Sequence, residues 1–154
     1  MAIQVVTTEQ STLFTIRTKH TTYQMKADEY GVLLHLWYGA SVEGDMSYLL
    51  DYPDVGFSGN LYEAENRRTY SLNTLPLEYA TEGVGDFRIS AVAATHADGS
   101  NALDLRYQSY NILKGKYAIA GLPAVYADED EAETLEVSTG DDKNTVRVVK
   151  PDGT

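Results

Sequence analysis

The sequence predicts a mainly β fold, an antiparallel β-sandwich. Apolar and polar residues alternate with a period of two over several short segments, which is typical of strands that turn one face toward a core. Turn-forming residues separate these segments, and no segment carries the sustained apolar stripe and capping residues of an amphipathic helix. The 154 residues are enough for one domain with its own hydrophobic core.

Five segments carry the alternation and are predicted as strands with one solvent-exposed face. Their apolar members are Phe14 and Ile16, then Tyr23 and Met25, then Leu103, Leu105 and Tyr107, then Leu135 and Val137, and finally Val146 and Val148. Thr15 and Gln24 are among the polar members, which we expect on the solvent side. Residues 31–38 differ because they are almost continuously apolar, and this predicts a strand covered on both faces.

Turn chemistry separates the predicted strands. Residues 28–31 read Asp-Glu-Tyr-Gly between two strands and predict a hairpin turn. Residues 97–100 read Ala-Asp-Gly-Ser and predict a tight hairpin, because Asp-Gly supplies the positive φ that such a turn needs. Further breaks are expected at residues 114–116 and 121–123, after the strand that contains Asp104.

Two segments are not predicted as strands. Residues 51–81 are long, irregular and rich in Tyr, Asn, Arg and Glu, and loops of that length inside a compact domain are usually functional. Residues 128–136 hold six carboxylates and no basic side chain, which predicts a solvated loop between strands. The alternative is a calcium site, but the Asp-x-Asp-x-Asp-Gly loop that would organise one is missing.

The composition excludes several classes of function. The net charge of −11 argues against nucleic acid and anionic membranes as partners, since both require a basic surface. The sequence has no cysteine, which excludes disulfides, thiolate catalysis and cysteine-based zinc sites. Three histidines, His20, His35 and His96, lie in different segments without metal-ligand spacing, so we expect no metal and no cofactor. No secretion signal and no membrane span are apparent, and we expect a bacterial cytoplasmic protein.

An ordered series of short motifs resembles the N-terminal region of glycoside hydrolase family 36, the bacterial α-galactosidases. The motifs are Leu33-Leu34-His35-Leu36-Trp37-Tyr38-Gly39, Phe57-Ser58-Gly59-Asn60-Leu61-Tyr62-Glu63, Ser71-Leu72-Asn73-Thr74-Leu75-Pro76-Leu77-Glu78-Tyr79, Gly85-Asp86-Phe87-Arg88, Asp98-Gly99-Ser100, Asp104-Leu105-Arg106-Tyr107, Lys114-Gly115-Lys116, Gly121-Leu122-Pro123-Ala124 and Glu131-Ala132-Glu133-Thr134-Leu135. One such motif would be weak evidence for a resemblance, but the series keeps its order and spacing over most of the chain.

The resemblance implies a defined place in a larger enzyme. In that family an N-terminal β-supersandwich precedes a (β/α)8 barrel, and the intact enzyme hydrolyses terminal α-galactosides such as melibiose and raffinose with retention of configuration. Retention requires two carboxyl groups, which the family keeps in its barrel, one of them in a Lys-Trp-Asp motif. The single tryptophan here, Trp37, lies between Leu36 and Tyr38. The resemblance therefore implies an inactive, non-catalytic piece that spans residues 1–149 of a partial supersandwich, with residues 150–154 as an off-pattern tail.

Two departures from the family pattern affect the expected boundaries. Residues 58–60 read Ser-Gly-Asn where the family has Ser-Pro-Asn, and this removes a restraint on φ in the loop. After Val149 the family pattern continues into further strands, whereas this sequence stops shortly afterwards. We expect that ending to be a truncation or a fragment boundary that leaves an open sheet edge.

The best candidate for a functional surface is the irregular segment between residues 51 and 70. Family enzymes are commonly tetramers, and loops of this domain can approach the barrel mouth of another subunit. Tyrosine, arginine and carboxylate side chains are typical of sugar-binding rims and oligomer contacts. The predicted rim residues are Asp51, Asp54, Phe57, Asn60, Tyr62, Arg67, Arg68 and Tyr70. The alternative is a solvated loop that packs on its own sheet.

Other hypotheses stay open at the level of the sequence. Asp86 and Arg88 would share one strand face, where they would either form a structural pair or hold a loop beside an active site. A second hypothesis for the whole chain is a free-standing carbohydrate-binding β-sandwich that stacks tyrosines on sugar rings. Its twelve tyrosines are scattered along the sequence, which favours the α-galactosidase interpretation. Nothing specific supports a capsid or other structural β protein.

Overall fold

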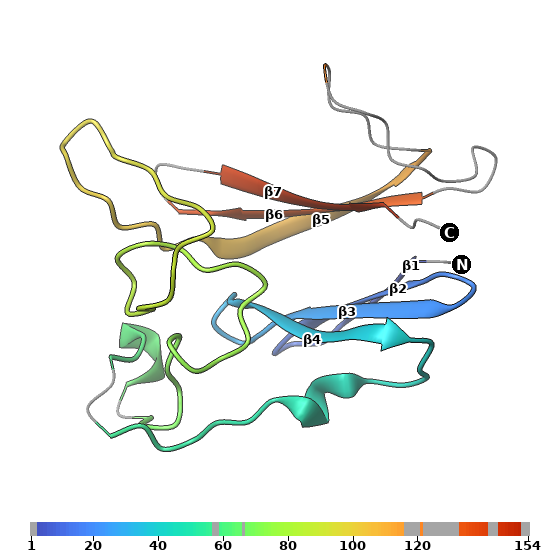
Figure 1. Cartoon of the computed structure of the whole chain (residues 1–154), viewed down its shortest axis with the longest axis horizontal. Coiled ribbons are helices and arrows are strands. Elements are labelled where there is room, and N and C mark those ends of the chain that lie inside the picture. Colours follow the sequence, from blue (N-terminus) through green and yellow to red (C-terminus); the bar gives the residue numbers. More distant parts are fainter. Residues whose placement is uncertain are drawn as a thin grey trace.

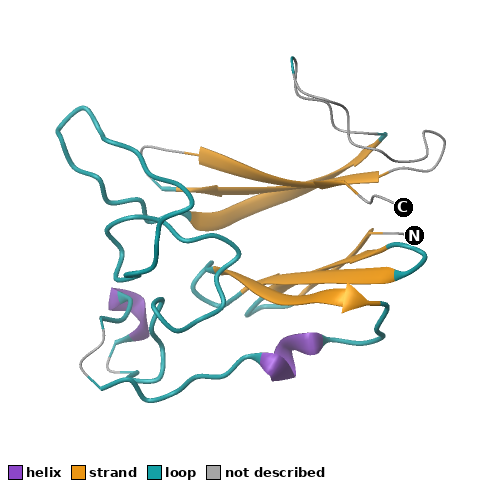
Figure 2. Ribbon diagram, viewed as in Figure 1, coloured by secondary structure: helices purple, strands orange, loops and turns teal. Residues whose placement is uncertain are grey.

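Two antiparallel sheets lie face to face in the computed structural model of the chain (Figures 1 and 2). The structure describes residues 3–56, 59–65, 67–115, 121, 133–141 and 145–151. The first sheet has the order β1 (Ile3–Thr7), β2 (Thr12–Arg17), β3 (Thr21–Ala27) and β4 (Leu33–Ala40). The second has the order β5 (Arg106–Lys114), β6 (Glu133–Gly140) and β7 (Thr145–Pro151). The predicted mainly β, antiparallel sandwich is confirmed.

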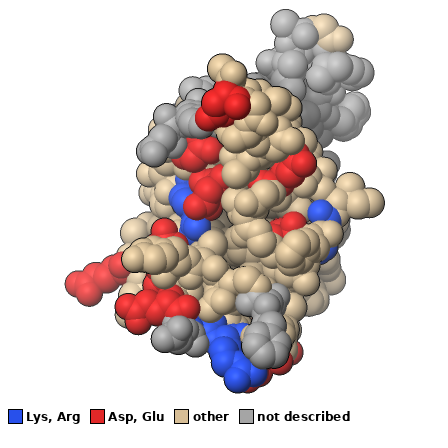
Figure 3. All heavy atoms as spheres, turned by 90° about the vertical axis from the view of Figure 1, so that its left-hand side faces the viewer, with Lys and Arg blue, Asp and Glu red and all other residues tan. Residues whose placement is uncertain are grey.

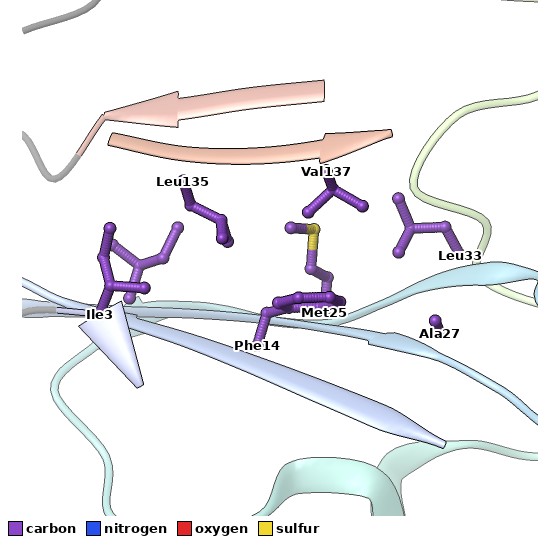
Figure 4. Packing of buried hydrophobic residues seen from close by; sticks show 8 residues of the cluster. Ile3, Phe14, Met25, Ala27, Leu33, Leu135 and Val137 are labelled. Carbon is purple, nitrogen blue, oxygen red and sulfur yellow. The ribbon is translucent and has the colours of Figure 1, made fainter. Parts of the chain in front are cut away.

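The hydrophobic core fills the space between the two sheets, as Figure 4 shows. It contains Ile3, Phe14, Ile16, Met25, Ala27 and Leu33 from the first sheet, and Leu135 and Val137 from the second. The ring of Phe14 also makes edge-on contacts with Tyr107 and Tyr110, at centroid distances of 5.9 and 5.6 Å. The apolar members of the alternating segments on β2, β3 and β6 thus face the core, as the sequence predicts.

A second apolar cluster lies on the other side of β4. It contains Val32, Leu34, Leu61, Ala64, Tyr70, Leu72 and Leu75. Leu33 packs into the first cluster and its neighbour Leu34 into the second, so the start of β4 is covered on both faces as predicted. Tyr38, near the end of β4, is 69% exposed, so the double cover does not extend over the whole strand.

The predicted hairpin turn at residues 28–31 is confirmed between β3 and β4. The Asp28 carboxylate accepts hydrogen bonds from the backbone N–H groups of Tyr30 and Val32, each at 2.9 Å, in the manner of an Asx turn. Gly31 has a φ of 74°, a conformation that glycine adopts without steric cost. The turn also contacts the second sheet, because the Tyr107 N–H donates to the Gly31 carbonyl at 2.7 Å.

The outer face of β2 and β3 was predicted to be exposed to solvent, and this prediction is wrong. Thr15 and Gln24 are buried there and do not face solvent. Residues 42–47, which include the start of the 3-10 helix η1 (Met46–Leu49), fold back over this face. Gln24 donates to the Gly44 carbonyl at 2.7 Å and to Thr15 Oγ1 at 3.0 Å, and it accepts from the Met46 N–H at 3.0 Å. Buried polar side chains are tolerated when hydrogen bonds satisfy them in this way.

The second sheet also differs in detail from the sequence prediction. The strand expected through Leu103, Leu105 and Tyr107 begins only at Arg106, although Leu103 and Leu105 are buried as their alternation suggests. The turn at residues 97–100 forms, with the His96 N–H bonded to the Ser100 carbonyl at 2.8 Å, but neither flank is a strand, so it is no hairpin.

The acidic run is only partly a loop. Glu133 and Glu136 belong to β6, and Glu136 is buried, so that part of the solvated-loop prediction is wrong. Residues 128–132 lie outside the described part of the chain.

Between β4 and β5 the chain runs through a long irregular connection, residues 41–105. Within its described part the only helical turns are η1 and a second 3-10 helix, η2 (Tyr62–Ala64). The irregular character predicted for residues 51–81 is therefore confirmed, and it extends well beyond them. Figure 1 shows the green and yellow part of this connection gathered at one end of the sandwich. No helix in the described residues is long and apolar enough to cross a membrane.

Candidate functional surface

Residues 51–70, here called the arm, are anchored on the second apolar cluster. Leu61, Ala64 and Tyr70 are buried in that cluster, and they fix the arm against the outer side of β4. Because η2 spans a single turn, anchoring it through Leu61 and Ala64 leaves Tyr62 and Glu63 on the solvent side, with Tyr62 95% exposed. The side-chain amide of Asn60 closes the next turn by donating to the carbonyls of Glu65 and Arg67, at 3.1 and 3.2 Å.

Tyr70 joins the arm to the turn between β3 and β4. Its hydroxyl donates to Asp28 Oδ2 at 2.5 Å, and its ring lies edge-on to Tyr30 at 4.8 Å and nearly parallel to Tyr52 at 6.3 Å. Burial raises the pKa of Asp28 above its ordinary value, although the hydrogen bond from Tyr70 opposes this shift. Burial, with the nearby Asp28 charge, also raises the pKa of Tyr70, which therefore stays protonated and keeps donating.

Arg67 contacts the same junction, between the arm and the β3–β4 turn, on its solvent side. Its guanidinium donates to Glu29 Oε1 at 2.6 Å and lies over the rings of Tyr52 and Tyr70, 5.6 and 5.7 Å from their centroids. A small hollow of about 150 Å³ remains beside it, lined among others by Lys26. Because the charges and rings of this junction already satisfy one another, its role is to fix the base of the arm.

The arm carries a second, more exposed ion pair. Arg68 Nη2 lies 3.0 Å from Asp54 Oδ1, and the two side chains are 65% and 55% exposed. An exposed pair of this kind contributes little to stability, about 0–1 kcal/mol. It therefore leaves a guanidinium and a carboxylate available to a partner or a polar ligand.

A wide, open hollow of about 560 Å³ lies beside the arm. It is lined by Asn60, Leu61, Tyr62, Glu63 and Glu65. Glu65 has a positive φ of 50°, which is uncommon for a residue with a side chain and costs about 1–3 kcal/mol. Figure 3 shows the end of the sandwich where the irregular connection lies. Acidic side chains are spread over this face, and basic ones are confined to a few places.

The structure brings together some of the predicted rim residues and separates others. Arg67 and Tyr70 contact each other, Asn60 holds the backbone beside them, and Asp54 pairs with Arg68. Tyr62 points outward on η2, and Asp51 is exposed. Phe57 lies outside the described residues.

Sequence reasoning missed the partners that hold the arm. Asp28 and Glu29 were interpreted only as turn residues, although two consecutive carboxylates beside an aromatic residue offered a signal for arginine binding. Arg106 was missed as well. Its guanidinium donates to Asp104 at 2.5 Å and to the Tyr30 carbonyl at 2.9 Å, and it thereby ties the start of β5 to the same turn.

The Asp86–Arg88 pair is structural and does not lie on a strand. Arg88 binds both carboxylate oxygens of Asp86, at 2.9 and 3.0 Å, and also donates to the Leu72 carbonyl at 2.7 Å. The Asp86 side chain is fully covered, so the expectation of a pair on a solvent-exposed strand face is wrong.

The histidines stand apart from one another. His35 Nδ1 lies 3.3 Å from the Tyr23 hydroxyl and 3.4 Å from Glu78 Oε2, and the Tyr23 hydroxyl donates to Glu78. The half-buried imidazole of His35 therefore has two polar partners. In the part of the chain that the structure describes, no cluster of three or more His, Asp or Glu side chains is placed to hold a metal ion.

Comparison with known proteins shows which family this chain resembles in sequence. Residues 31–150 match the family model of the glycosyl hydrolase family 36 N-terminal domain. The bifunctional alpha-galactosidase/sucrose kinase of Mediterraneibacter gnavus is 50% identical over 136 residues, which are 88% of this chain and 14% of that protein. The alpha-galactosidase Mel36A of Lactobacillus acidophilus is 41% identical over 136 residues, 86% of this chain and 18% of that protein.

Solved structures agree with these sequence matches. The galactosidase domain of an alpha-galactosidase–sucrose kinase superposes with a TM-score of 0.87 at 44% identity, over 96% of this chain and 21% of that one. A family 36 alpha-galactosidase of Geobacillus stearothermophilus, solved in complex with raffinose, gives a TM-score of 0.78 at 35% identity, over 90% of this chain and 19% of its own. The chain thus spans about a fifth or less of the length of these relatives. The two-sheet sandwich, its irregular connection and its sequence together show that the chain belongs to the glycosyl hydrolase family 36 N-terminal domain family.

Proposed function

We propose that the chain is the non-catalytic N-terminal part of an alpha-galactosidase. The intact enzyme would hydrolyse terminal α-galactosides such as melibiose and raffinose, in the bacterial cytoplasm, with its catalytic carboxylates in a barrel domain outside this chain. The observation that carries the proposal is the match over nearly the whole chain to a small N-terminal share of alpha-galactosidases. Residues 1–149 would then be part of a larger supersandwich.

Within that enzyme, the arm would form the rim of an active site and a contact between subunits. Its base is fixed by buried groups, Tyr70 on Asp28 and Leu61 in the apolar cluster. The arm also presents the exposed Asp54–Arg68 pair and the exposed ring of Tyr62 to solvent. A fixed base with exposed polar and aromatic side chains suits recognition of a sugar or of a neighbouring subunit.

A chimera tests the proposal directly. This chain would replace the matching segment of the Mediterraneibacter gnavus enzyme, and hydrolysis of a chromogenic α-galactoside would be measured. We expect the chimera to be active, and the chain alone to be inactive. An inactive but folded chimera would contradict the proposal, as would turnover by the repurified chain alone that exceeds a denatured control.

Variants of the chimera test the role of the arm. Arg68→Ala, Arg67→Ala and Tyr62→Ala should lower kcat/KM about tenfold or more, or reduce the mass of the oligomer, while β-sheet content by circular dichroism stays unchanged. Tyr48→Ala is the matched control, because Tyr48 is also a tyrosine on a 3-10 helix and is 75% exposed. If all three arm variants are as active and as oligomeric as the control, the arm is only a solvated loop.

A further inference from the structure

Two large apolar side chains stand out from the surface next to each other. Phe87 is 80% exposed and Ile89 is 97% exposed, and only Arg88 separates them in the sequence. Arg88 binds Asp86 and the Leu72 carbonyl, although its side chain remains 41% exposed between the two apolar residues. We call this pair of side chains the Phe87–Ile89 knob.

The backbone beneath the knob is held firmly. The Phe87 N–H donates to Asn73 Oδ1 at 3.1 Å, and the fully covered Asp86 carboxylate binds the Arg88 backbone N–H at 3.0 Å as well as its guanidinium. These bonds attach the knob to residues 72 and 73, and Leu72 belongs to the apolar cluster that also anchors the arm. Because this backbone is already ordered, binding at the knob costs little further backbone entropy.

The charge around the knob limits what can cover it. The whole chain carries a net charge of −11, whereas the knob is apolar and the ion pair beneath it is neutral. A second copy of the chain would bring the same negative charge, which opposes that contact at low ionic strength. The relatives, in contrast, carry about four-fifths or more of their length outside the segment that matches this chain, and that part is available to cover the knob within one molecule.

We propose that the Phe87–Ile89 knob is the anchor by which this domain packs onto the remainder of the same enzyme, filling an apolar depression on the catalytic part. This inference rests on the proposed function. It differs from the role of the arm, because the knob bears no charge and joins two parts of one chain, whereas the arm serves the substrate or a neighbouring subunit.

Single-cysteine labelling tests the contact, since the chain has no cysteine of its own. Phe87→Cys, Ile89→Cys and the control Tyr48→Cys would each be made in the chimera. After reaction with a thiol reagent and proteolysis, mass spectrometry would measure how fast the peptide that contains the new cysteine is labelled. We expect positions 87 and 89 to be labelled at least about tenfold more slowly than position 48. In the free chain, where the side chains are 80%, 97% and 75% exposed, the three rates should be similar.

The outcomes separate this inference from the proposed function. Rapid labelling at 87 and 89 in an active chimera would overturn the knob as a contact and leave the proposed function intact. Protection that disappears on dilution of the protein would also overturn it, because the cover would then be a second copy. Slow labelling that does not depend on concentration supports the contact within one molecule, and it does so whether or not the chimera turns over substrate.

Discussion

Gln24 provides a sharp test of how the outer face of the first sheet is stabilised. Its side chain is fully buried and makes three hydrogen bonds, with Thr15 Oγ1, the Gly44 carbonyl and the Met46 N–H. Substitution Gln24→Ala removes all three bonds and leaves two backbone groups, on Gly44 and Met46, without a side-chain partner. The segment that contains η1 then loses two of its polar attachments to β3, while the two hydrogen bonds between Thr22 and Val42 remain.

The size of the effect follows from these contacts. A net contribution of about 1 kcal/mol for each hydrogen bond gives a loss of about 3 kcal/mol in the free energy of unfolding. For a chain of this length, about 2–4 °C is lost per kcal/mol, so the melting temperature should fall by about 6–12 °C. Gln4→Ala is the matched control, because Gln4 lies exposed on β1 and accepts a single bond from Arg17, and it should cost less than about 0.5 kcal/mol.

Thermal melts followed by circular dichroism, with urea unfolding beside them, measure the difference between the two variants. Hydrogen exchange should also show faster exchange at the Met46 N–H in Gln24→Ala than in Gln4→Ala. If the two variants melt within a degree of each other and exchange alike, residues 42–47 do not depend on Gln24, and the account of the buried outer face is wrong.

Three further predictions concern pH, salt and calcium. Burial raises the pKa of Tyr23 and Tyr70 above 10.0, so the folded chain keeps protons that the unfolded chain releases. Stability should be full below pH 10 and fall above it by about 1.4 kcal/mol per pH unit for each of these two tyrosines. Because Tyr48 and Tyr62 are exposed, only the part of the tyrosinate absorbance that comes from Tyr23 and Tyr70 should appear together with loss of the β-sheet signal. The free chain should self-associate more as salt rises from low to physiological strength, since screening weakens the repulsion of its −11 charge; light scattering that shows a stable monomer at both salts would contradict this. Micromolar calcium should leave the melting temperature unchanged, and a rise of many degrees would identify an organised site in the acidic run.

Local signals in the sequence predicted much of the sandwich. The alternation through Phe14 and Met25 identified the core face of β2 and β3, and the Asp-Glu-Tyr-Gly turn located the β3–β4 hairpin. Periodicity did not predict the burial of Gln24, because the cover comes from residues 42–47, which fold back across the sheet. Alternation at Leu103 and Leu105 predicted burial correctly but not pairing, because the ladder with β6 starts at Arg106.

The arm shows the same division between local and distant signals. Its irregular composition, with Arg67 and Tyr70, was visible in the sequence as a candidate surface. The groups that hold it, Asp28 and Glu29, lie far earlier in the chain, and only the fold brings them within hydrogen-bond distance.

The strand order of the first sheet has a bearing on how the chain folds. β1 to β4 pair strictly with their neighbours in sequence, so each hairpin closes a short loop at a small entropic cost. β5 follows only after the long connection, and it must find the turn at Gly31 across a wide sequence separation. We expect the first sheet to form early, and Phe14 and Met25 to stay uncovered until the second sheet forms. Pulse-labelled hydrogen exchange should then protect β2 and β3 before β6, and simultaneous protection would show that the two sheets condense together.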